Sequence, residues 1–175
     1  MALRGVVVFR VPRMRLLVVR HAIAQPPGKD VADEDRQLTP RGRRRFHKAA
    51  RGLARILPRP DALLTSPLPR AVETAEIAAD AWGRVEPTLE PRLAGGDDEG
   101  LLSSIAATHG EDAVVALVGH EPHVSALLAR LIQGAGEHLP FKKGGAALVE
   151  VDEDARNGRL IWFAPPRLLR RLGSD

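Results

Sequence analysis

The stretch LLVVRHA, residues 16–22, runs an apolar segment straight into an arginine and a histidine. An unbroken apolar run of this length is typical of a strand that is buried on both faces, as in a parallel or mixed sheet. We therefore predict a strand over residues 15–20. Its end is unusual, because Arg20 and His21 can both carry positive charge where turn-forming residues such as Gly, Asp or Ser are expected.

Apolar and polar patterns farther along the chain predict further strands and helices. We expect strands over residues 62–65, 84–89, 113–118, 146–151 and 160–163. Helical spacing of apolar residues predicts helices over residues 40–57, 68–82, 101–108 and 122–132. Pro87 restricts its strand to a sheet edge, and Asn157-Gly158 predicts a hairpin. This order predicts an α/β fold, a three-layer sandwich with a mixed, mostly parallel central sheet and helices on both faces.

Two of the predicted helices share a start signal. Thr39 precedes Pro40, and Ser66 precedes Pro67. A Ser or Thr side chain can accept a hydrogen bond from a free N–H of the first helical turn, and proline suits the first helical position. We expect Thr39 and Ser66 to cap the helices that follow them.

Length and composition limit the classes of protein that the chain can belong to. Its 175 residues fit a single domain, which we place at residues 14–175, with residues 1–13 as an N-terminal extension before Met14. Cysteine is absent, which excludes disulfides, a thiolate nucleophile and Cys-based metal sites. The sequence has neither a membrane-spanning apolar run nor a signal-peptide pattern. We expect a cytoplasmic protein without membrane contact, and a monomer.

The charge is unevenly distributed along the chain. The net charge is +4, but residues 1–59 carry 15 basic and 4 acidic side chains, net +11, and residues 60–175 have a net charge of −7. Nucleic-acid binders add aromatic residues for base stacking, whereas aromatics are 3% of this sequence and Tyr is absent. We expect no nucleic-acid partner. A small anionic substrate or a phosphorylated protein would use the same positive field.

Charged residues follow three of the predicted strands. The first strand ends in Arg20-His21, and another is followed by His120. The strand over residues 62–65 is followed by Ser66, with Arg70 one helical turn later. Ligands of open α/β sheets bind beyond the carboxyl ends of the strands, so these side chains should meet in one crevice. Arginine forks suit phosphate oxygens, helix N-termini add N–H donors, and a neutral histidine can attack phosphorus. The sequence therefore predicts a phosphate site.

Four segments in this order resemble the histidine phosphatase superfamily. They are LLVVRHA (16–22), LTPRG (38–42), LLTSPLPRAVETA (63–75) and ALVGHEP (116–122). The short chain, with no inserted segment between the second strand and the Gly-His strand, is similar to the SixA type of phosphohistidine phosphatase. The resemblance implies the fold of the histidine phosphatase and phosphoglycerate mutase-like proteins.

The resemblance also implies roles for the residues at the strand ends. His21 would attack phosphorus and become transiently phosphorylated, Arg20 and Arg70 would bind the phosphoryl oxygens, and His120 would donate to them. Ser66 would contact the substrate. Neither a metal nor another cofactor would be required. Arg36, in DRQLT, stands near where SixA-type sequences have a substrate-binding arginine, although surface charge explains it equally well.

The chain departs from the family pattern at the expected proton donor. Members that act on phosphate esters use a Glu or Asp after the second helix, and Pro91 stands at that place here. Asp97, Asp98 and Glu121 are candidate substitutes for this acid, and Glu121 is also a candidate substrate contact. An alkoxide leaving group needs a proton, whereas a ring-protonated phosphohistidine leaves as neutral imidazole. A weak or missing acid therefore favours phosphohistidine of a protein as substrate.

Three other functions remain open at this stage. A phosphatase of small phosphate esters belongs to the same superfamily. A metal-dependent hydrolase could use His123 together with the two strand-end histidines and Asp97 or Asp98. A non-catalytic phosphate- or nucleic-acid-binding module would keep its function without His21. The arginine run at residues 41–45 is most simply a solvated helix face, although it could dock an acidic partner.

Overall fold

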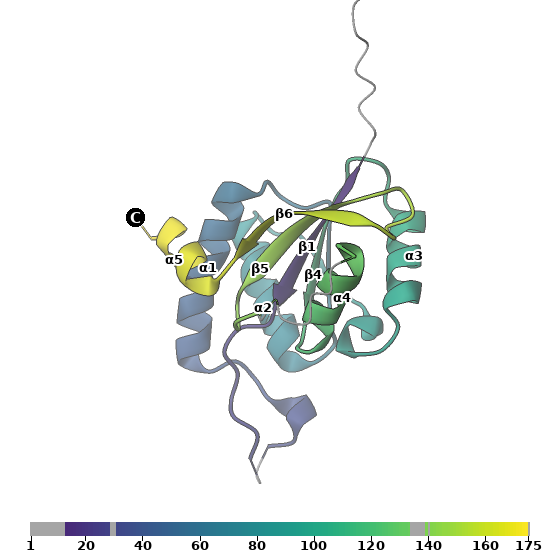
Figure 1. Ribbon diagram of the computed structural model, residues 1–175. Coiled ribbons are helices and arrows are strands. Elements are labelled where there is room, and N and C mark those ends of the chain that lie inside the picture. Colours follow the sequence, from purple (N-terminus) through teal and green to yellow (C-terminus); the bar gives the residue numbers. More distant parts are fainter. Residues whose placement is uncertain (1–12, 29–30, 134–138, 140, 175) are drawn as a thin grey trace, which may run out of the picture.

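The computed structural model describes residues 13–28, 31–133, 139 and 141–174, which form a six-stranded sheet with helices on both faces (Figure 1). The strand order is β3-β2-β4-β1-β5-β6. The strands are β1 (Met14–Arg20), β2 (Ala62–Thr65), β3 (Pro87–Leu89), β4 (Val114–Gly119), β5 (Ala146–Val151) and β6 (Gly158–Ala164). The helices are η1 (Asp33–Asp35), α1 (Pro40–Ile56), α2 (Pro69–Ala81), η2 (Pro91–Ala94), α3 (Asp98–Thr108), α4 (His123–Leu131) and α5 (Pro166–Leu172). The predicted fold class is confirmed.

Strand direction brings the carboxyl ends of three strands together at one end of the sheet. β1, β2, β3 and β4 are mutually parallel, whereas β5 and β6 add an antiparallel pair beside β1. Arg20 pairs with Gly119, and Thr65 pairs with Val118. The carboxyl ends of β1, β2 and β4 are therefore in register, so that the residue after each strand points into the same region.

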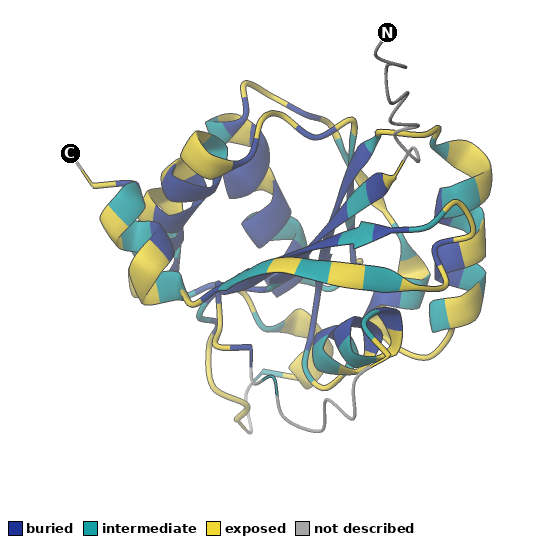
Figure 2. Cartoon of the chain, turned by 45° about the horizontal axis from the view of Figure 1, so that its top comes forward, coloured by how far each residue is buried: buried dark blue, intermediate teal, exposed yellow. Residues whose placement is uncertain are grey.

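β1 is buried on both faces, as its apolar run predicts. Leu17 and Val19 pack against α1, α2 and α5, while Leu16 and Val18 pack against α3 and α4. All four side chains are at most 1% exposed. Figure 2 shows the same arrangement, with the central strands and the inner faces of the helices buried, and with the edge strand β6 and the outer faces of the helices largely exposed or half-buried. The apolar packing on both faces of the sheet fixes the position of β1 and therefore the positions of Arg20 and His21 at its end.

The two predicted caps have different outcomes. Thr39 caps α1, because its Oγ1 accepts a hydrogen bond from the N–H of Gly42 at 2.9 Å. The cap predicted at Ser66 is wrong, since α2 begins at Pro69 after an N-cap residue, Leu68, whose side chain makes no capping bond. Ser66 continues the strand pairing instead, with its N–H donating to the carbonyl of Val118 at 3.0 Å. Its hydroxyl accepts a hydrogen bond from the N–H of Leu68 at 3.3 Å and also contacts the site described below.

Two predicted elements differ from the structure at the edges of the fold. β3 lies at the sheet edge as predicted but is shorter than residues 84–89, because Arg84 has a left-handed backbone with φ 68°. α5 has no counterpart among the predicted helices. It packs on α1 so closely that a Cβ on Gly52 would lie 2.0 Å from the carbonyl oxygen of Leu169.

The predicted N-terminal extension, residues 1–13, lies outside the described residues except for Arg13. That arginine forms an ion pair with Glu150 of β5 at 3.0 Å. Among the helices that the structure describes, none has the length and apolarity needed to cross a lipid bilayer.

Candidate active site

The residues that follow β1, β2 and β4 lie side by side at the carboxyl end of these parallel strands. The N–H of His21 donates to the carbonyl of Gly119 at 3.0 Å, so the chain after β1 stays paired to the end of β4. The His21 and His120 rings lie 5.0 Å apart, centre to centre. His21, Ser66 and His120 are all buried, with exposures of 4%, 0% and 5%. The predicted convergence of these strand ends is present.

His21 is held with one ring nitrogen engaged and the other available. Its Nδ1 lies 2.7 Å from the carbonyl oxygen of Ala22. A carbonyl only accepts, so Nδ1 carries the proton and Nε2 keeps its lone pair. The Ala22 peptide is itself anchored, because its N–H donates to Thr74 Oγ1 of α2 at 3.0 Å. The backbone therefore selects the tautomer that a nucleophile at Nε2 needs.

The surroundings of His21 favour its neutral form. Burial is the largest cause that lowers the pKa of His21, to about 3, and His120, Arg70 and Arg20 lower it further. The bond to the Ala22 carbonyl opposes this shift without reversing it. An imidazole with this pKa is unprotonated at neutral pH, and only the neutral ring can attack phosphorus.

His120 is oriented by Ser66. Its Nε2 lies 2.7 Å from Ser66 Oγ, and its Nδ1 is buried without a hydrogen-bond partner. Burial, followed by the charge of Arg70, lowers the pKa of His120 to about 4. Ser66 is thus a positioning residue for His120, which explains why this serine follows β2 although it does not cap a helix.

Three arginines surround the histidines, and Asp33 engages two of them. Arg70 donates from Nη2 to Asp33 Oδ2 at 3.0 Å and from Nη1 to the Asp33 carbonyl. Arg36 donates to Asp33 Oδ1 at 2.7 Å, so the structure brings this predicted residue to the site. Arg20 donates to the carbonyl of Phe141. The charge of Arg70 is the main cause that lowers the pKa of Asp33, so this carboxyl is ionised.

Several buried nitrogen atoms at the site lack a partner. Among the described residues, the buried side-chain atoms without a hydrogen bond are Arg20 Nε, Arg36 Nε, Arg70 Nε and His120 Nδ1. Buried polar groups are ordinarily hydrogen-bonded, and a group of unpaired nitrogens around cationic side chains calls for an acceptor with several oxygens. A phosphoryl group has that chemistry. The arrangement can bind phosphate and bring its phosphorus to His21.

A segment before β5 encloses the site, and the sequence patterns did not identify it. The N–H of Gly144 donates to the carbonyls of both Arg20 and His21 at 3.1 Å. Its φ of +77° is a left-handed conformation that favours glycine. Burial, followed by the charges of Arg20, Arg36 and Arg70, lowers the pKa of Lys143. The signal was visible in the sequence KKGG at 142–145, a glycine turn directly before a strand.

Two of the three carboxylates predicted as substitute acids, Glu121 and Asp97, accept hydrogen bonds from other groups. Glu121 Oε1 accepts hydrogen bonds from Ser125 Oγ at 2.7 Å and from the N–H of Phe141 at 3.0 Å. Asp97 caps α3 by accepting from the N–H of Gly100 at 2.8 Å. Asp98 is the first residue of α3, and no described hydrogen bond or ion pair joins it to the site. The acid role predicted for these residues has no support from their contacts.

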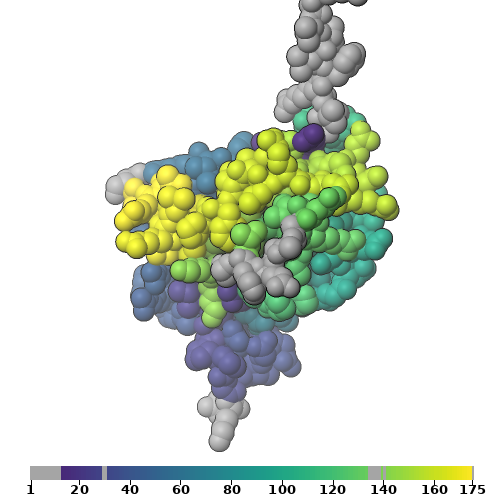
Figure 3. Space-filling model, viewed as in Figure 1, coloured from purple at the N-terminus to yellow at the C-terminus, as the bar shows by residue number. Residues whose placement is uncertain are grey.

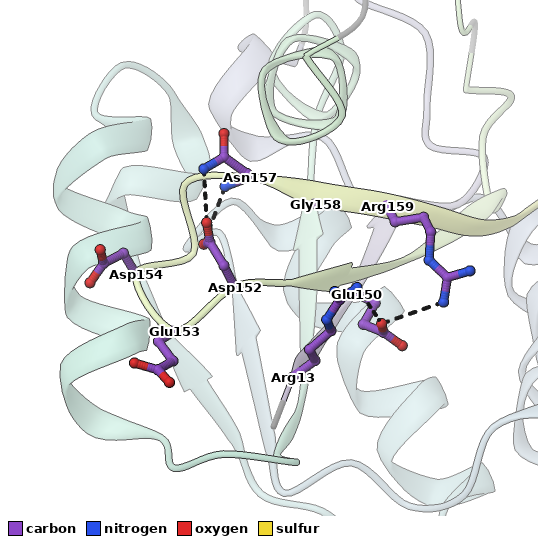
Figure 4. Close-up of a pocket in the computed structure, with 8 residues that line it drawn as sticks. All are labelled: Arg13, Glu150, Asp152, Glu153, Asp154, Asn157, Gly158 and Arg159. Atoms are coloured by element: carbon purple, nitrogen blue, oxygen red, sulfur yellow. Dashed lines mark hydrogen bonds and ion pairs between the residues drawn. The ribbon is translucent and has the colours of Figure 1, made fainter. Parts of the chain in front are cut away.

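A cleft of about 470 Å³ opens at the opposite end of the sheet, beside the turn between β5 and β6 (Figure 4). Two of its four acidic side chains are paired, Glu150 with Arg13 and Arg159, and Asp152 with Asn157, whereas Glu153 and Asp154 also line the cleft. Across the described part of the chain, no group of three or more His, Asp or Glu side chains could hold a metal ion. The metal-site alternative with His123 therefore lacks a ligand set in these residues.

Comparisons with known proteins agree with this geometry. A family model described as the histidine phosphatase superfamily (branch 1) matches residues 16–102. An uncharacterized protein of Picosynechococcus is 35% identical over 75% of this chain and 82% of its own length.

Two solved structures combine a similar fold with similar sequence. The protein histidine phosphatase SixA complexed with tungstate has a TM-score of 0.76 and 30% identity over 88% of this chain and 98% of that one. A putative phosphohistidine phosphatase SixA from Agrobacterium tumefaciens has a TM-score of 0.72 and 30% identity over 87% and 97%. A mycobacterial glucosyl-3-phosphoglycerate phosphatase shares the fold, with a TM-score of 0.69 at 19% identity over 87% and 99%.

Proposed function

The chain belongs to the histidine phosphatase superfamily, and we propose that it removes phosphate from phosphohistidine of a protein through a phosphohistidine intermediate on His21. One observation carries the proposal. The Nδ1 proton of His21 is held by the Ala22 carbonyl, which leaves a neutral ring with Nε2 free among cationic side chains. A neutral histidine beside arginines has the protonation state of a nucleophile for a phosphoryl group.

In the first step, Nε2 of His21 donates its electron pair to phosphorus. A P–N bond to His21 forms as the P–N bond of the substrate breaks, and the bonding pair leaves with the substrate imidazole. Arg20 and Arg70 bind the oxygens on which negative charge resides, and Arg70 releases Asp33 to do so. Positioned cations of this kind stabilise the transition state of phosphoryl transfer without covalent participation.

In the second step, water attacks the phosphorus of phosphorylated His21. The new P–O bond forms as the P–N bond to His21 breaks, and the bonding pair returns to Nε2 of His21. The water proton passes to an oxygen of the phosphoryl group, and inorganic phosphate leaves. His120 donates to the phosphoryl oxygens in both steps. When the Ser66 hydroxyl donates to Nε2 of His120, the ring proton of His120 is on Nδ1. This buried N–H has no acceptor among the described residues, so it can donate to a phosphoryl oxygen.

Among the carboxylates that the structure describes, none is held as a proton donor at the site, and this supports a P–N substrate. Asp33, the carboxylate in contact with the site arginines, has a lowered pKa and cannot protonate an alkoxide. Glu121 and Asp97 accept hydrogen bonds from other groups. A phosphohistidine whose ring is protonated needs no donor, because it leaves as neutral imidazole.

The proposed reaction needs no metal ion. Arg20, Arg70 and His120 supply the positive charge and the donors that a divalent cation would otherwise supply at the transferring phosphoryl group. We expect full activity after treatment with EDTA. Activity that disappears with chelation and returns with added metal would contradict the proposal and favour the metal-dependent hydrolase.

Phosphate trapped on His21 is the most direct test. The protein is mixed briefly with a histidine-phosphorylated protein, quenched in alkali and analysed by mass spectrometry. We expect a phosphate on His21 in the wild type and none in His21→Asn, whose side-chain amide can still donate to the Ala22 carbonyl. If His21 never carries phosphate and His21→Asn hydrolyses the substrate normally, the mechanism is wrong.

A substrate panel separates the two superfamily alternatives. We expect kcat/KM for phosphohistidine to exceed kcat/KM for sugar phosphates and glycerol phosphate by about a hundredfold or more, because no donor protonates their alkoxides. Comparable kcat/KM values for the esters would indicate that the enzyme acts on small phosphate esters, with His21 still the nucleophile.

A further inference from the structure

A second cationic region adjoins the active site, and the reaction itself makes no use of it. A shallow surface groove of only about 10 Å³ lies between α1 and α5 and reaches Ala22, the residue after His21. Arg45, Lys143 and Arg170 line it together with apolar side chains, and no carboxylate is among its lining residues. We call these three residues and the groove between them the basic groove. Figure 3 shows α5 (yellow) adjoining both the light-green segment before β5 and the purple segment after β1 on one face.

The basic groove is electrostatically continuous with the site. Gly144, which follows Lys143, donates to the carbonyls of Arg20 and His21. The charges of Arg20, Arg36 and Arg70 reach Lys143 and contribute to lowering its pKa. The positive potential therefore extends from the arginines that bind phosphate to the outer surface of α1 and α5.

Among the described residues, most cations of α1 and α5 have no acidic partner. Within the described residues, no ion pair or hydrogen bond to a carboxylate involves Arg41, Arg44, Arg45, Lys48, Arg167, Arg170 or Arg171. Several of them are four residues apart on one helix, a spacing at which like charges repel. Burial, followed by the neighbouring charges of Arg45 and Arg167, lowers the pKa of Arg170.

Not all arginines of α1 are free in this way. Arg51 donates to the carbonyl of Gly173, Arg55 donates to that of Leu172, and Arg43 pairs with Glu73. These three hold α5 or α2 in place. The unpaired cations lie elsewhere on the two helices and leave positive charge that the fold itself does not neutralise.

We propose that the basic groove docks an acidic surface of the phosphorylated protein substrate, so that its phosphohistidine is presented to His21. This inference rests on the proposed function and specifies the partner that the site takes. Complementary charge favours encounter and orientation of a protein partner. The opposite end of the sheet carries Glu150, Asp152, Glu153 and Asp154 (Figure 4), so an acidic partner would be repelled there and attracted at the site.

A nucleic acid is the less suitable occupant. Single-stranded nucleic acids are bound by positive grooves with exposed aromatic rings for base stacking. The aromatic residue in the groove, Phe46, is 2% exposed and belongs to the core. An acidic protein surface can bind to the cations of the groove through its carboxylates, without aromatic rings for stacking.

The test compares matched substrates. A peptide with one phosphohistidine and flanking Glu and Asp residues is paired with a twin that carries Gln and Asn instead, and free phosphohistidine serves as the minimal substrate. We expect kcat/KM of the wild type to be about tenfold higher for the acidic peptide than for the twin, with the difference decreasing as salt increases.

Charge-reversal variants test whether the preference for the acidic peptide depends on the basic groove. In Arg45→Glu/Arg170→Glu we expect kcat/KM for the acidic peptide to fall about tenfold or more, through KM, with free phosphohistidine hydrolysed as in the wild type. Arg59→Glu, on the exposed loop before β2, is the control that should behave as wild type. Arg45→Gln/Arg170→Gln, which removes charge without adding any, should give a smaller loss.

Each outcome decides the proposal. It is overturned if the wild type does not distinguish the two peptides, if the reversal lowers hydrolysis of both peptides equally, or if single-stranded RNA binds the groove more tightly than the acidic peptide does. Hydrolysis of free phosphohistidine and phosphate on His21 report the proposed function separately. Failure of those two readouts in the wild type would refute the function, whereas their success without a peptide preference would refute docking alone.

Discussion

Removal of the buried His21 side chain should flatten the dependence of folding stability on pH. Burial lowers the pKa of His21 from 6.5 to about 3 in the folded protein. In the unfolded chain the ring binds a proton below about pH 6.5, so acid favours unfolding. The stability that the neutral ring contributes is fully present above this pH and is lost progressively as the pH falls toward 3.

The size of the effect follows from these two pKa values. From about pH 7.5 to about pH 5, a histidine that titrates at 6.5 unfolded and at about 3 folded removes about 2 kcal/mol from the free energy of unfolding. His21→Asn lacks this contribution. We therefore expect the wild type to lose about 2 kcal/mol more than His21→Asn over this interval, whatever their difference in stability at neutral pH.

Urea unfolding followed by circular dichroism at several pH values measures the effect. The titrations of carboxyl groups are shared by both proteins and cancel in the comparison. His47→Asn, which removes an exposed histidine of α1, is the matched control for the loss of a histidine side chain. Parallel curves for the wild type and His21→Asn would refute the reasoning, since they would mean that His21 titrates alike in the folded and unfolded states.

Three further substitutions test contacts of the fold and the site. Gly52→Ala should lower the free energy of unfolding by about 3 kcal/mol in urea titrations, because its Cβ would meet the Leu169 carbonyl at 2.0 Å; an unchanged midpoint would contradict this. Asp33→Asn should lower the Kd for phosphate in calorimetry by about two- to fivefold, because Arg70 no longer holds a competing carboxylate; weaker binding would contradict this. Glu121→Ala should reduce kcat about tenfold by loosening the loop before β5, whereas Glu121→Gln should retain most of it; equal losses would contradict this.

The sequence was informative where local pattern and strand direction act together. The apolar run before Arg20 predicts β1, and the parallel strands then bring His21, Ser66 and His120 to one edge without knowledge of loops. Thr39-Pro40 likewise predicts the start of α1, because a cap depends on neighbours within one turn. These inferences need only the period of each element and the rule that parallel strands end together.

The remaining features depend on contacts between distant parts of the chain. Asp33 reaches Arg70 from a loop 37 residues earlier, and the Gly144 N–H reaches the end of β1 from beyond α4. Ser66 matches a cap signature, but tertiary pairing with Val118 directs its backbone elsewhere. α5 is short and is held by α1, so its sequence alone gave little signal. Local sequence patterns do not show which residues far apart in the chain come into contact.

The contacts of Asp33 indicate how a phosphoryl group would enter the site. Its ionised carboxylate lies between Arg70 and Arg36, where it partly neutralises two cations that would otherwise repel each other. A phosphoryl dianion offers more oxygens and more charge than one carboxylate, so it can displace Asp33 and also engage the nitrogens that Asp33 leaves unpaired. The displaced carboxylate remains an anion and has no proton to give. In the proposed reaction, the cations that bind the phosphoryl group thus keep Asp33 ionised, which favours substrates whose leaving group already carries its proton.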